Sequence, residues 1–377
     1  MRAKKAIAAC AAAGCLALVA AGCSSGSGSG GSSDSKAATA TSAAALGGMN
    51  ALVTAAKKEG HLNVITLPSD WANYGTIMKD FTAKYGIQIT DENPDGTSQD
   101  ELNAIAQTKG QSRAPDVVDV GTAFAAKGEA AGDWAPYKVA TWDDIPANSK
   151  APNGDYYADY GGYVAIGYDT SKVKTPPTSF KDLLNPQYKN MVALNGSPTE
   201  AGAAFAGVYA AALSNGGSFG DIAPGVSYFK KLHQAGNFVP VTGSASTMES
   251  GQTPILVWWD YLLASEVGAS YKNLKIVIPT DSHYAAYYDQ AVSKYAPDPA
   301  AARLWEEYLY STVGQNLFLA GGTRPIELPT LVSAGTVDQK AYAALPPAPS
   351  GATTFPSIAQ QNAAENVIAQ QWPTVTG

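Results

Sequence analysis

Residues 255–266 read ILVWWDYLLASE and place two tryptophans directly before an aspartate at the end of an apolar run. Adjacent residues of a strand point to opposite faces, so one indole can enter the core while its neighbour faces outward. An aromatic face beside a carboxylate is also a combination that binds an ammonium group. We therefore predict that Trp259 and Asp260 face a cleft and that Trp258 packs inside, with the alternative that Asp260 only caps the following helix.

A second group of candidates follows the apolar stretch 62–67. The sequence LPSDWANYG brings Asp70, Trp71 and Tyr74 to the carboxyl end of this predicted strand. Ser69 or Asp70 could cap the next helix while Trp71 packs on it. In a binding loop, the same segment would supply aromatic rings and a second carboxylate from the other side of the cleft.

Hydroxyl groups stand at two further element ends. Thr122 follows the predicted strand 116–121. Ser197 and Glu200 have the spacing of a capping box, which predicts a helix that starts there, and Thr199 would add a hydrogen-bond donor. Free backbone N–H groups at such a helix start can hold an anionic group of a ligand.

The run HYAAYYDQ at 283–290 contains the paired tyrosines Tyr287 and Tyr288. Two phenolates could bind a ferric ion, but neighbouring residues of a strand face opposite ways. We expect both rings to pack, with the phenol of Tyr287 at the rim of the cleft.

An exported hydrolase is the rival class of protein. Gly216, Ser218 and Gly220 match the pattern G-x-S-x-G, but a nucleophile elbow needs a strand before it, and here a long helix is predicted. The three histidines of the chain have no metal-binding spacing. The 32 acidic residues allow many acid–base pairs, and no spacing singles one out. We predict no enzyme activity, no cofactor and no metal site.

The elements that position these residues alternate between helix and strand. An order of this kind predicts parallel strands with right-handed crossovers, whose carboxyl ends meet the ligand. The first series comprises helices at 49–60, 73–85 and 98–109 and strands at 62–67, 87–90 and 116–121. The second has strands near 162 and at 190–196, 255–259 and 274–279, a strand-like run at 284–294, and helices from 198 and near 221–235, 297–311 and 356–370. The sequence therefore predicts two α/β lobes.

The length of the chain also predicts two lobes. About 330 residues follow the N-terminal region, more than a single core of ~250–300 residues accommodates. We assign residues 46–162 plus 280–312 to lobe 1 and residues 163–279 plus 313–377 to lobe 2, with hinge crossings near residues 162 and 279.

The N-terminus reads as an export signal. Residues 1–22 combine a basic start, an apolar stretch and small residues. The segment LVAAGC resembles a lipobox, the bacterial motif whose cysteine, here Cys23, becomes lipidated. The Gly/Ser-rich residues 23–45 would then form a flexible tether. Removal of residues 1–22 takes away three basic groups and leaves a net charge of −10, which disfavours nucleic acid as a partner.

The lipobox and several stretches in order resemble the extracellular solute-binding lipoproteins of bacterial ABC importers. These stretches are ALVTAAKKEGHLNVITLPSDWANY, PDVVDVG, SFKDLLNPQYKNMVALN, ESGQTPILVWWDYLL and PDPAAARLWEEYLYSTVGQNLFL. The resemblance is to the branch that binds polyamines, ferric iron, thiamine or 2-aminoethylphosphonate. It implies a two-lobed, periplasmic-binding-protein-like fold of type II, in which each lobe has a mixed, mostly parallel sheet flanked by helices.

The resemblance also implies a function and partners. Such a protein is a monomer on the outer face of the cell membrane that closes on a small solute and delivers it to an ABC permease. Polyamine-binding relatives place a tryptophan and an aspartate near the position of Trp258 to Asp260, which favours a polyamine-like amine. Ferric-iron binders carry adjacent tyrosines at that position, and this sequence departs from them. A 2-aminoethylphosphonate ligand would use the carboxylate together with the helix start at Ser197.

Overall fold

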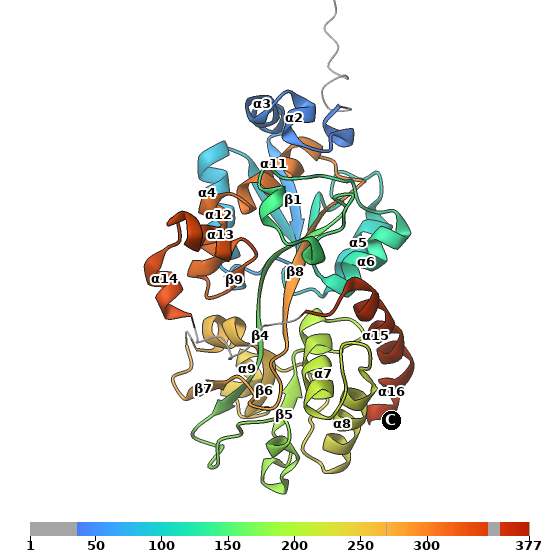
Figure 1. Cartoon of the computed structure of the whole chain (residues 1–377), viewed down its shortest axis with the longest axis vertical. Helices are drawn as coiled ribbons and strands as arrows, with labels where there is room; N and C mark the ends of the chain where they lie inside the picture. The colour runs from blue at the N-terminus through green and yellow to red at the C-terminus, as the bar shows by residue number, and fades with distance from the viewer. Residues whose placement is uncertain (1–35, 269, 346–354, 377) are drawn as a thin grey trace, which may run out of the picture.

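The computed structural model describes residues 36–268, 270–345 and 355–376, so the predicted signal peptide 1–22 and Cys23 lie outside the described residues. The described residues form two α/β lobes, one above the other in Figure 1, joined by the long strands β4 (Tyr157–Asp169) and β8 (Ala285–Val292). The predicted two-lobed fold is thus confirmed. Within this part of the chain, no helix has the length and apolar character needed to cross a membrane.

Lobe 1 is the upper half in Figure 1. Its strands are β1 (His61–Ile65), β2 (Gln88–Glu92), β3 (Val117–Gly121) and β9 (Arg324–Pro325). Its helices are α2 (Ala43–Leu46), α3 (Met49–Glu59), α4 (Tyr74–Tyr85), α5 (Ser98–Thr108), α6 (Thr122–Ala131), α11 (Pro299–Leu309), α12 (Thr312–Ala320), α13 (Leu328–Ala334) and α14 (Gln339–Ala344). Short 3₁₀ turns occur at Trp142–Asp144 and Ala147–Ser149.

Lobe 2 is the lower half. Its strands are β5 (Val192–Leu194), β6 (Ile255–Trp259) and β7 (Leu274–Val277). Its helices are α7 (Gly202–Ser214), α8 (Ala223–Gln234), α9 (Ala245–Glu249), α10 (Asp260–Leu262) and α16 (Pro373–Thr376). Short 3₁₀ turns occur at Asp182–Leu184 and Pro186–Tyr188, and a π-helical turn at Leu263–Val267 follows α10.

The sheets are mixed, and the crossing strands account for most of their antiparallel ladders. β1 and β2 run parallel, as do β5 and β6. β3 lies beside β1, where the Asp116 N–H donates to the Asn63 carbonyl at 2.8 Å, but its ladder is antiparallel and goes to β8. The predicted parallel order therefore holds for β1 and β2, while β8 returns from lobe 2 to become the antiparallel neighbour of β3.

The two crossing strands form the hinge region. The first half of β4 pairs with β8, and its second half pairs with β6 and β7 of lobe 2. A strand of 13 residues is ~40 Å long, enough to belong to both lobes. The predicted crossing at residue 162 lies within β4, and β8 begins a few residues after the predicted crossing at 279.

The C-terminal helix α15 (Ile358–Gln371) adds a third connection. It packs against α6 of lobe 1 and against α8 of lobe 2, along one side of the molecule in Figure 1. Glu365 of α15 forms an ion pair with Lys127 of α6. The side chain of Trp372, just after α15, packs on Phe229 and Phe238 of lobe 2.

Residues 313–345 differ in position from the sequence-based assignment, which placed them in lobe 2. α12 packs against α4 and α11, and the Asn73 amide of lobe 1 donates to the Leu317 carbonyl at 2.9 Å. β9 pairs with β4 at Tyr160 and Gly161. These contacts place the segment with the upper half, because α12 follows α11 after a short turn and packs beside it.

Residues 36–45, the described part of the predicted flexible tether 23–45, are ordered. Ala37 and Ala40 are buried. The guanidinium of Arg303 in α11 donates to the carbonyls of Ala38 and Ala40 at 3.0 and 2.8 Å. The prediction is therefore wrong for residues 36–45, which are packed onto lobe 1 through a buried arginine.

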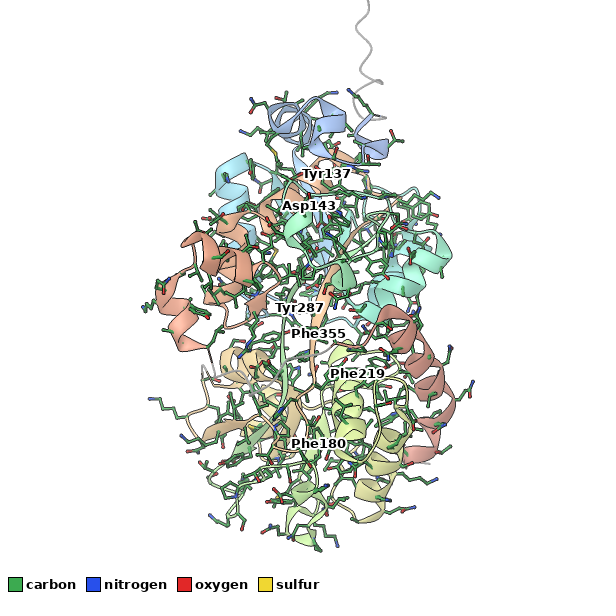
Figure 2. All side chains as sticks on the ribbon, viewed as in Figure 1. Tyr137, Asp143, Phe180, Phe219, Tyr287 and Phe355 are labelled. Atoms are coloured by element: carbon green, nitrogen blue, oxygen red, sulfur yellow. The ribbon has the colours of Figure 1, made fainter. Side chains whose placement is uncertain are left out.

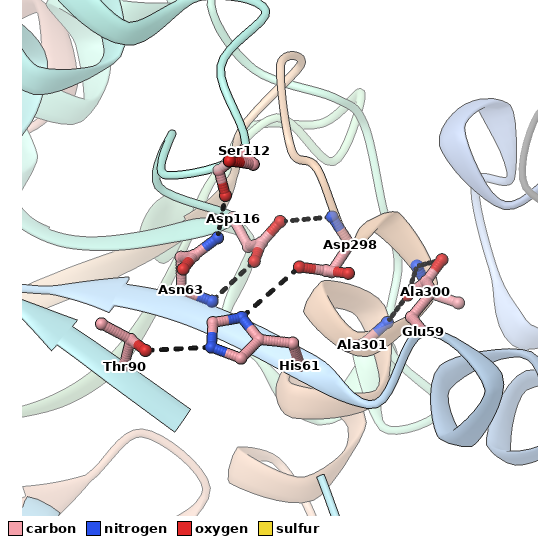
Figure 3. A network of polar contacts seen from close by, with 9 residues as sticks. All are labelled: Glu59, His61, Asn63, Thr90, Ser112, Asp116, Asp298, Ala300 and Ala301. Carbon is pink, nitrogen blue, oxygen red and sulfur yellow. Dashed lines mark hydrogen bonds and ion pairs between the residues drawn. The ribbon is translucent and has the colours of Figure 1, made fainter. Parts of the chain in front are cut away.

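A polar network fixes the start of α11 to β1 (Figure 3). The Glu59 carboxylate accepts hydrogen bonds from the N–H groups of Ala300 and Ala301, and the Asp116 carboxylate accepts from the N–H groups of Asn63 and Asp298. Carboxylates stabilise the positive end of a helix dipole. These contacts hold a segment that returns from lobe 2 in register with lobe 1, and so help to position the hinge.

Candidate functional site

A cleft of about 590 Å³ lies between the two lobes. Its lobe 1 wall consists of Thr66, Pro68, Asp70, Trp71, residues 94–98, Glu101 and Asp119. Its lobe 2 wall consists of residues from 195–203, Thr242, Ser244, Ser246, Trp258 and Glu266, and Tyr288 of the crossing strand β8 also lines it. A cleft of this size accommodates a small molecule.

Carboxylates dominate the charge of this cleft. Among the described residues that line it there is no lysine, arginine or histidine, and the acidic side chains are Asp70, Asp95, Glu101, Asp119, Glu200 and Glu266. Their summed negative potential attracts cations and repels anions from the entrance.

The two most buried carboxylates, those of Glu101 and Asp119, lie side by side. Glu101 projects from α5 and is fully buried, and its Oε2 accepts a 3.0 Å hydrogen bond from the Asp119 N–H. Asp119 Oδ2 accepts hydrogen bonds from the hydroxyls of Tyr160 and Tyr74 at 2.7 and 2.9 Å. Glu101 Oε1 and Asp119 Oδ1 are buried and have no partner among the described residues. Such orphaned acceptors are costly unless a ligand donates to them.

Burial changes the acidity of this pair. It raises the pKa of Glu101 well above its usual value, and the neighbouring charge of Asp119 adds to the effect. Burial also raises the pKa of Asp119, although the hydrogen bonds from Tyr160 and Tyr74 oppose it. Burial therefore opposes the charged form of both carboxyl groups, and a cation placed beside them would favour it.

A second acidic group lies nearer to solvent. Asp70 and Asp95 are exposed, and Glu266, on the π-helical turn of lobe 2, is partly buried. Burial, and then the charges of Asp70 and Asp95, raise the pKa of Glu266 to about 8. Carboxylates from both lobes therefore interact across the entrance.

Aromatic rings form the apolar part of the cleft. The Trp71 indole Nε1 donates to the Tyr160 hydroxyl at 2.6 Å, and its ring meets that of Tyr288 edge to face with centroids 5.7 Å apart. Trp258 is 2 % exposed, and its Nε1 has no partner among the described residues. These rings can pack on the methylene groups or the cationic head of a ligand.

The orientation predicted for the paired indoles is reversed with respect to this cleft. Trp258 lines it, whereas Trp259 lines a separate small hollow with Tyr288 and stacks on Tyr261. The alternation of the strand is as predicted, but the face was assigned wrongly. Alternation shows only that the two rings face opposite ways. The groups that pack on each face decide the rest, and the rings of Tyr261 and Tyr288 pack against Trp259.

Asp260 does not line the cleft. It is 1 % exposed, its Oδ2 forms a 2.8 Å ion pair with Arg324, and its Oδ1 accepts from the Tyr163 N–H. Burial raises the pKa of Asp260, and Arg324 opposes this shift. The predicted pairing of Asp260 with a ligand ammonium is not supported, since an arginine 64 residues away in the sequence already neutralises the carboxylate.

The other predicted residues are divided between the cleft and its surroundings. Asp70 and Trp71 line the cleft. Tyr74 is fully buried beneath it, where its hydroxyl donates to Asp119 and accepts from the Gln290 amide. Tyr74 thus supports a lining carboxylate without contacting the space itself.

Thr122 and Tyr287 lie at a different hollow, of about 30 Å³, together with Asp289 and Phe355. The rings of Tyr287 and Phe355 contact each other at the level of the hinge (Figure 2), with centroids 5.2 Å apart. Thr122 and Tyr287 do not line the larger cleft.

The segment before α7 differs from the predicted capping box. α7 starts at Gly202 with Ala201 as N-cap and no capping side chain. Ser197 instead forms a turn: its carbonyl accepts from the N–H groups of Glu200 and Ala201, and its hydroxyl contacts that of Thr199 at 2.7 Å. Ser197 lines the cleft and Thr199 does not. The predicted capping box at Ser197 is therefore wrong.

Sequence reasoning missed Glu101, Asp119 and Trp258 as cleft residues. A signal was available for Asp119, because a carboxylate in the apolar strand segment VVDV needs a hydrogen-bond or charge partner, from the protein or from a ligand. Glu101 is one of two acids in the first turn of α5, beside Asp100, where acids commonly stabilise the helix dipole. No local pattern distinguishes it from Asp100.

Comparison with known proteins agrees with this architecture. Residues 112–354 match the family model of bacterial extracellular solute-binding proteins. A ferric binding protein from Campylobacter jejuni is 16% identical, with a TM-score of 0.60 over 83% of this chain and 99% of its own. The fructose-6-phosphate-bound periplasmic binding protein AfuA from Actinobacillus pleuropneumoniae is 17% identical, with a TM-score of 0.62 over 84% and 97%.

A third solved structure, described as a spermidine/putrescine ABC transporter from Listeria monocytogenes, is 11% identical, with a TM-score of 0.59 over 84% of this chain and 98% of its own. At these identities the three structures establish a shared fold, and their descriptions name different solutes. The family model, in contrast, covers more than half of the sequence. This chain belongs to the family of bacterial extracellular solute-binding proteins.

Proposed function

We propose that this protein captures a small polar, amine-bearing solute, such as a polyamine, between its two lobes and delivers it to an ABC permease. The observation that carries the proposal is the interlobe cleft, whose charged side chains among the described residues are all acidic. Two of its buried carboxylate oxygens, on Glu101 and Asp119, lack a hydrogen-bond donor. An ammonium group supplies both the charge and the donors.

Capture would proceed by closure of the lobes. A ligand that contacts both walls stabilises the closed state by its additional interactions there, and the hinge strands β4 and β8 allow the lobes to move as units. Asp119 would hold the ammonium group from lobe 1, while Trp258 and Glu266 would contact the solute from lobe 2. The permease would recognise the closed form.

Ferric iron is the less favoured solute. Among the residues that the structure describes, no group of three or more His, Cys, Asp or Glu side chains is arranged to hold a metal ion. Tyr288 lines the cleft, but burial raises its pKa and so opposes the phenolate form that ferric ligation requires.

Calorimetry tests the proposed function. Putrescine, spermidine, thiamine and 2-aminoethylphosphonate would be titrated into the protein, with glucose and citrate as uncharged and anionic controls. We expect at least one amine to bind and the controls to give no heat. Binding of citrate in the absence of any amine binding would contradict the proposal. Recovery of the amine unaltered after prolonged incubation would separate solute binding from an enzymatic reaction.

We also propose that Cys23 is acylated after removal of residues 1–22, which would keep the protein at the outer face of the membrane. The support is the sequence LVAAGC and the basic, apolar segment before it. Mass spectrometry of the mature N-terminus would show a diacylglyceryl-modified Cys23, and Cys23→Ser should release the protein from the membrane fraction. An unmodified Cys23 in membrane-associated protein would contradict this assignment.

A further inference from the structure

The lobe 2 wall of the cleft carries hydrogen-bond donors that the amine proposal does not use. α7 has 13 residues, and its N-cap Ala201 provides no capping side chain. The backbone N–H groups of Gly202, Ala203 and Ala204 donate to no acceptor among the described residues. Gly202 and Ala203 line the cleft. The positive end of a helix dipole therefore opens into the ligand space.

Trp258 provides an independent donor at the same wall. Trp258 is only 2 % exposed, and it lines the cleft. Its Nε1 has no hydrogen-bond partner among the described residues. A buried indole N–H without an acceptor is uncommon in folded proteins and is satisfied when a ligand supplies one.

The start of α7 is close to the lobe 1 wall. A Cβ atom on Gly202 would lie 3.4 Å from the Cα atom of Gly121 at the end of β3, and 3.5 Å from the hydroxyl oxygen of Tyr288. Gly121 follows Asp119 by two residues on β3. The start of α7 therefore lies against the end of the strand that carries Asp119, and both Gly202 and Asp119 line the cleft.

We propose that the solute is a zwitterion, with an ammonium group and an acid group on one short carbon chain. The acid group accepts hydrogen bonds from the first N–H groups of α7 and from Trp258 Nε1, and the ammonium group donates to Glu101 and Asp119. This inference rests on the proposed capture of an amine and narrows the class of amine. A diamine would leave the donors of lobe 2 unsatisfied.

The acidic character of the cleft does not contradict an acid group on the ligand. Burial raises the pKa of Glu101 and of Asp119 and so opposes the charged form of both groups. The ammonium group favours their charged form, and the net charge of the ligand is zero. Glu200, the carboxylate nearest in sequence to the start of α7, is exposed to solvent, which screens it.

The test compares ligands of equal chain length by calorimetry with the full mature protein. The ω-amino acids β-alanine, 4-aminobutyrate and 5-aminovalerate would each be titrated beside the diamine and the monoamine with the same number of carbons. We expect the best ω-amino acid to bind roughly tenfold or more tighter than its matched diamine and monoamine, the gain of hydrogen bonds to a charged group. Equal or tighter binding of the diamine would overturn the zwitterion and leave the proposed amine capture intact. Absence of binding by every amine would overturn both.

Two neighbouring substitutions sharpen the test. Trp258→Phe removes the N–H and keeps an aromatic ring, and should lower the affinity for the ω-amino acid roughly tenfold while the monoamine loses less than twofold. Trp259→Phe is the matched control, because Trp259 lines the separate hollow and donates to Tyr288. Equal losses for amino acid and monoamine in Trp258→Phe would mean that the indole only packs, and would contradict its assigned role. Far-ultraviolet circular dichroism of each variant would verify that it folds.

Discussion

The wall of the cleft that comes from lobe 1 differs from the wall that comes from lobe 2 in the polar atoms that it leaves without partners. On lobe 1, these atoms are acceptors, Glu101 Oε1 and Asp119 Oδ1. On lobe 2, they are donors, Trp258 Nε1 and the first N–H groups of α7. A ligand that satisfies both walls needs both kinds of group, so the difference between the lobes carries information on the solute.

Two buried aspartates, Asp119 and Asp260, differ in the same way, in whether their carboxylate oxygens have partners. Asp119 lines the cleft with an oxygen that lacks a partner. Asp260, at the junction of β6 and α10, is held by Arg324 and by the Tyr163 N–H. Both are nearly inaccessible to water, yet only the first is available to a ligand. Burial alone therefore does not identify a binding carboxylate. What identifies it is a carboxylate oxygen that has no hydrogen-bond or ion-pair partner among the described residues.

The largest effect is expected for Asp260→Ala, on stability. The change removes the carboxylate of a buried ion pair with Arg324, which costs about 3–5 kcal/mol of the free energy of unfolding. Urea denaturation would measure it. Solute affinity of the folded variant should be unchanged. Lost affinity with unchanged stability would instead place Asp260 in the site, as the sequence predicted.

Asp119→Asn should act on affinity. The amide oxygen still accepts from Tyr74 and Tyr160, but the charge that pairs with the ammonium group is gone, which should weaken amine binding by about 2 kcal/mol or more. Calorimetry against the wild-type protein checks this. An affinity equal to wild type would remove Asp119 from the site.

Amine affinity should rise with pH between about 6 and 9. Burial, and then the charges of Asp70 and Asp95, raise the pKa of Glu266 to about 8. A bound cation lowers that pKa, so binding releases a proton below pH 8 and affinity falls as pH decreases, by up to about tenfold per unit for each proton released. The amine itself stays protonated, since its pKa is near 10.

Titration in buffers of different ionisation enthalpy would count the protons that are released when the amine binds. Glu266→Gln should flatten the dependence, and an unchanged slope would point to Glu101 and Asp119 instead.

The smallest effect is expected at the exposed rim. Asp95→Asn should lower amine affinity by only about 0.2–1 kcal/mol, because water and salt screen an exposed carboxylate. This loss should disappear at 0.5 M NaCl, whereas the loss in Asp119→Asn should persist. A rim variant as damaging as Asp119→Asn would contradict the distinction between deep and exposed carboxylates.

Local patterns predicted most of the architecture. The helix at 49–60 ends at Gly60, which adopts a left-handed conformation with φ of 73°, and the strand at 255–259 has the predicted bounds. Such features depend on neighbours a few residues apart, which a single sequence displays directly. The start of α7 was misplaced because a turn at Ser197 satisfies the same spacing as a capping box.

The sequence alone was sufficient for two α/β lobes and for the order of their main elements. Which tryptophan faces the cleft, which aspartate is already paired, and that Glu101 lies against Asp119 were decided only by the tertiary structure. Periodicity reports how residues alternate within one element, whereas the availability of a polar atom depends on groups that folding brings from elsewhere, such as Arg324 to Asp260 and α7 to the end of β3.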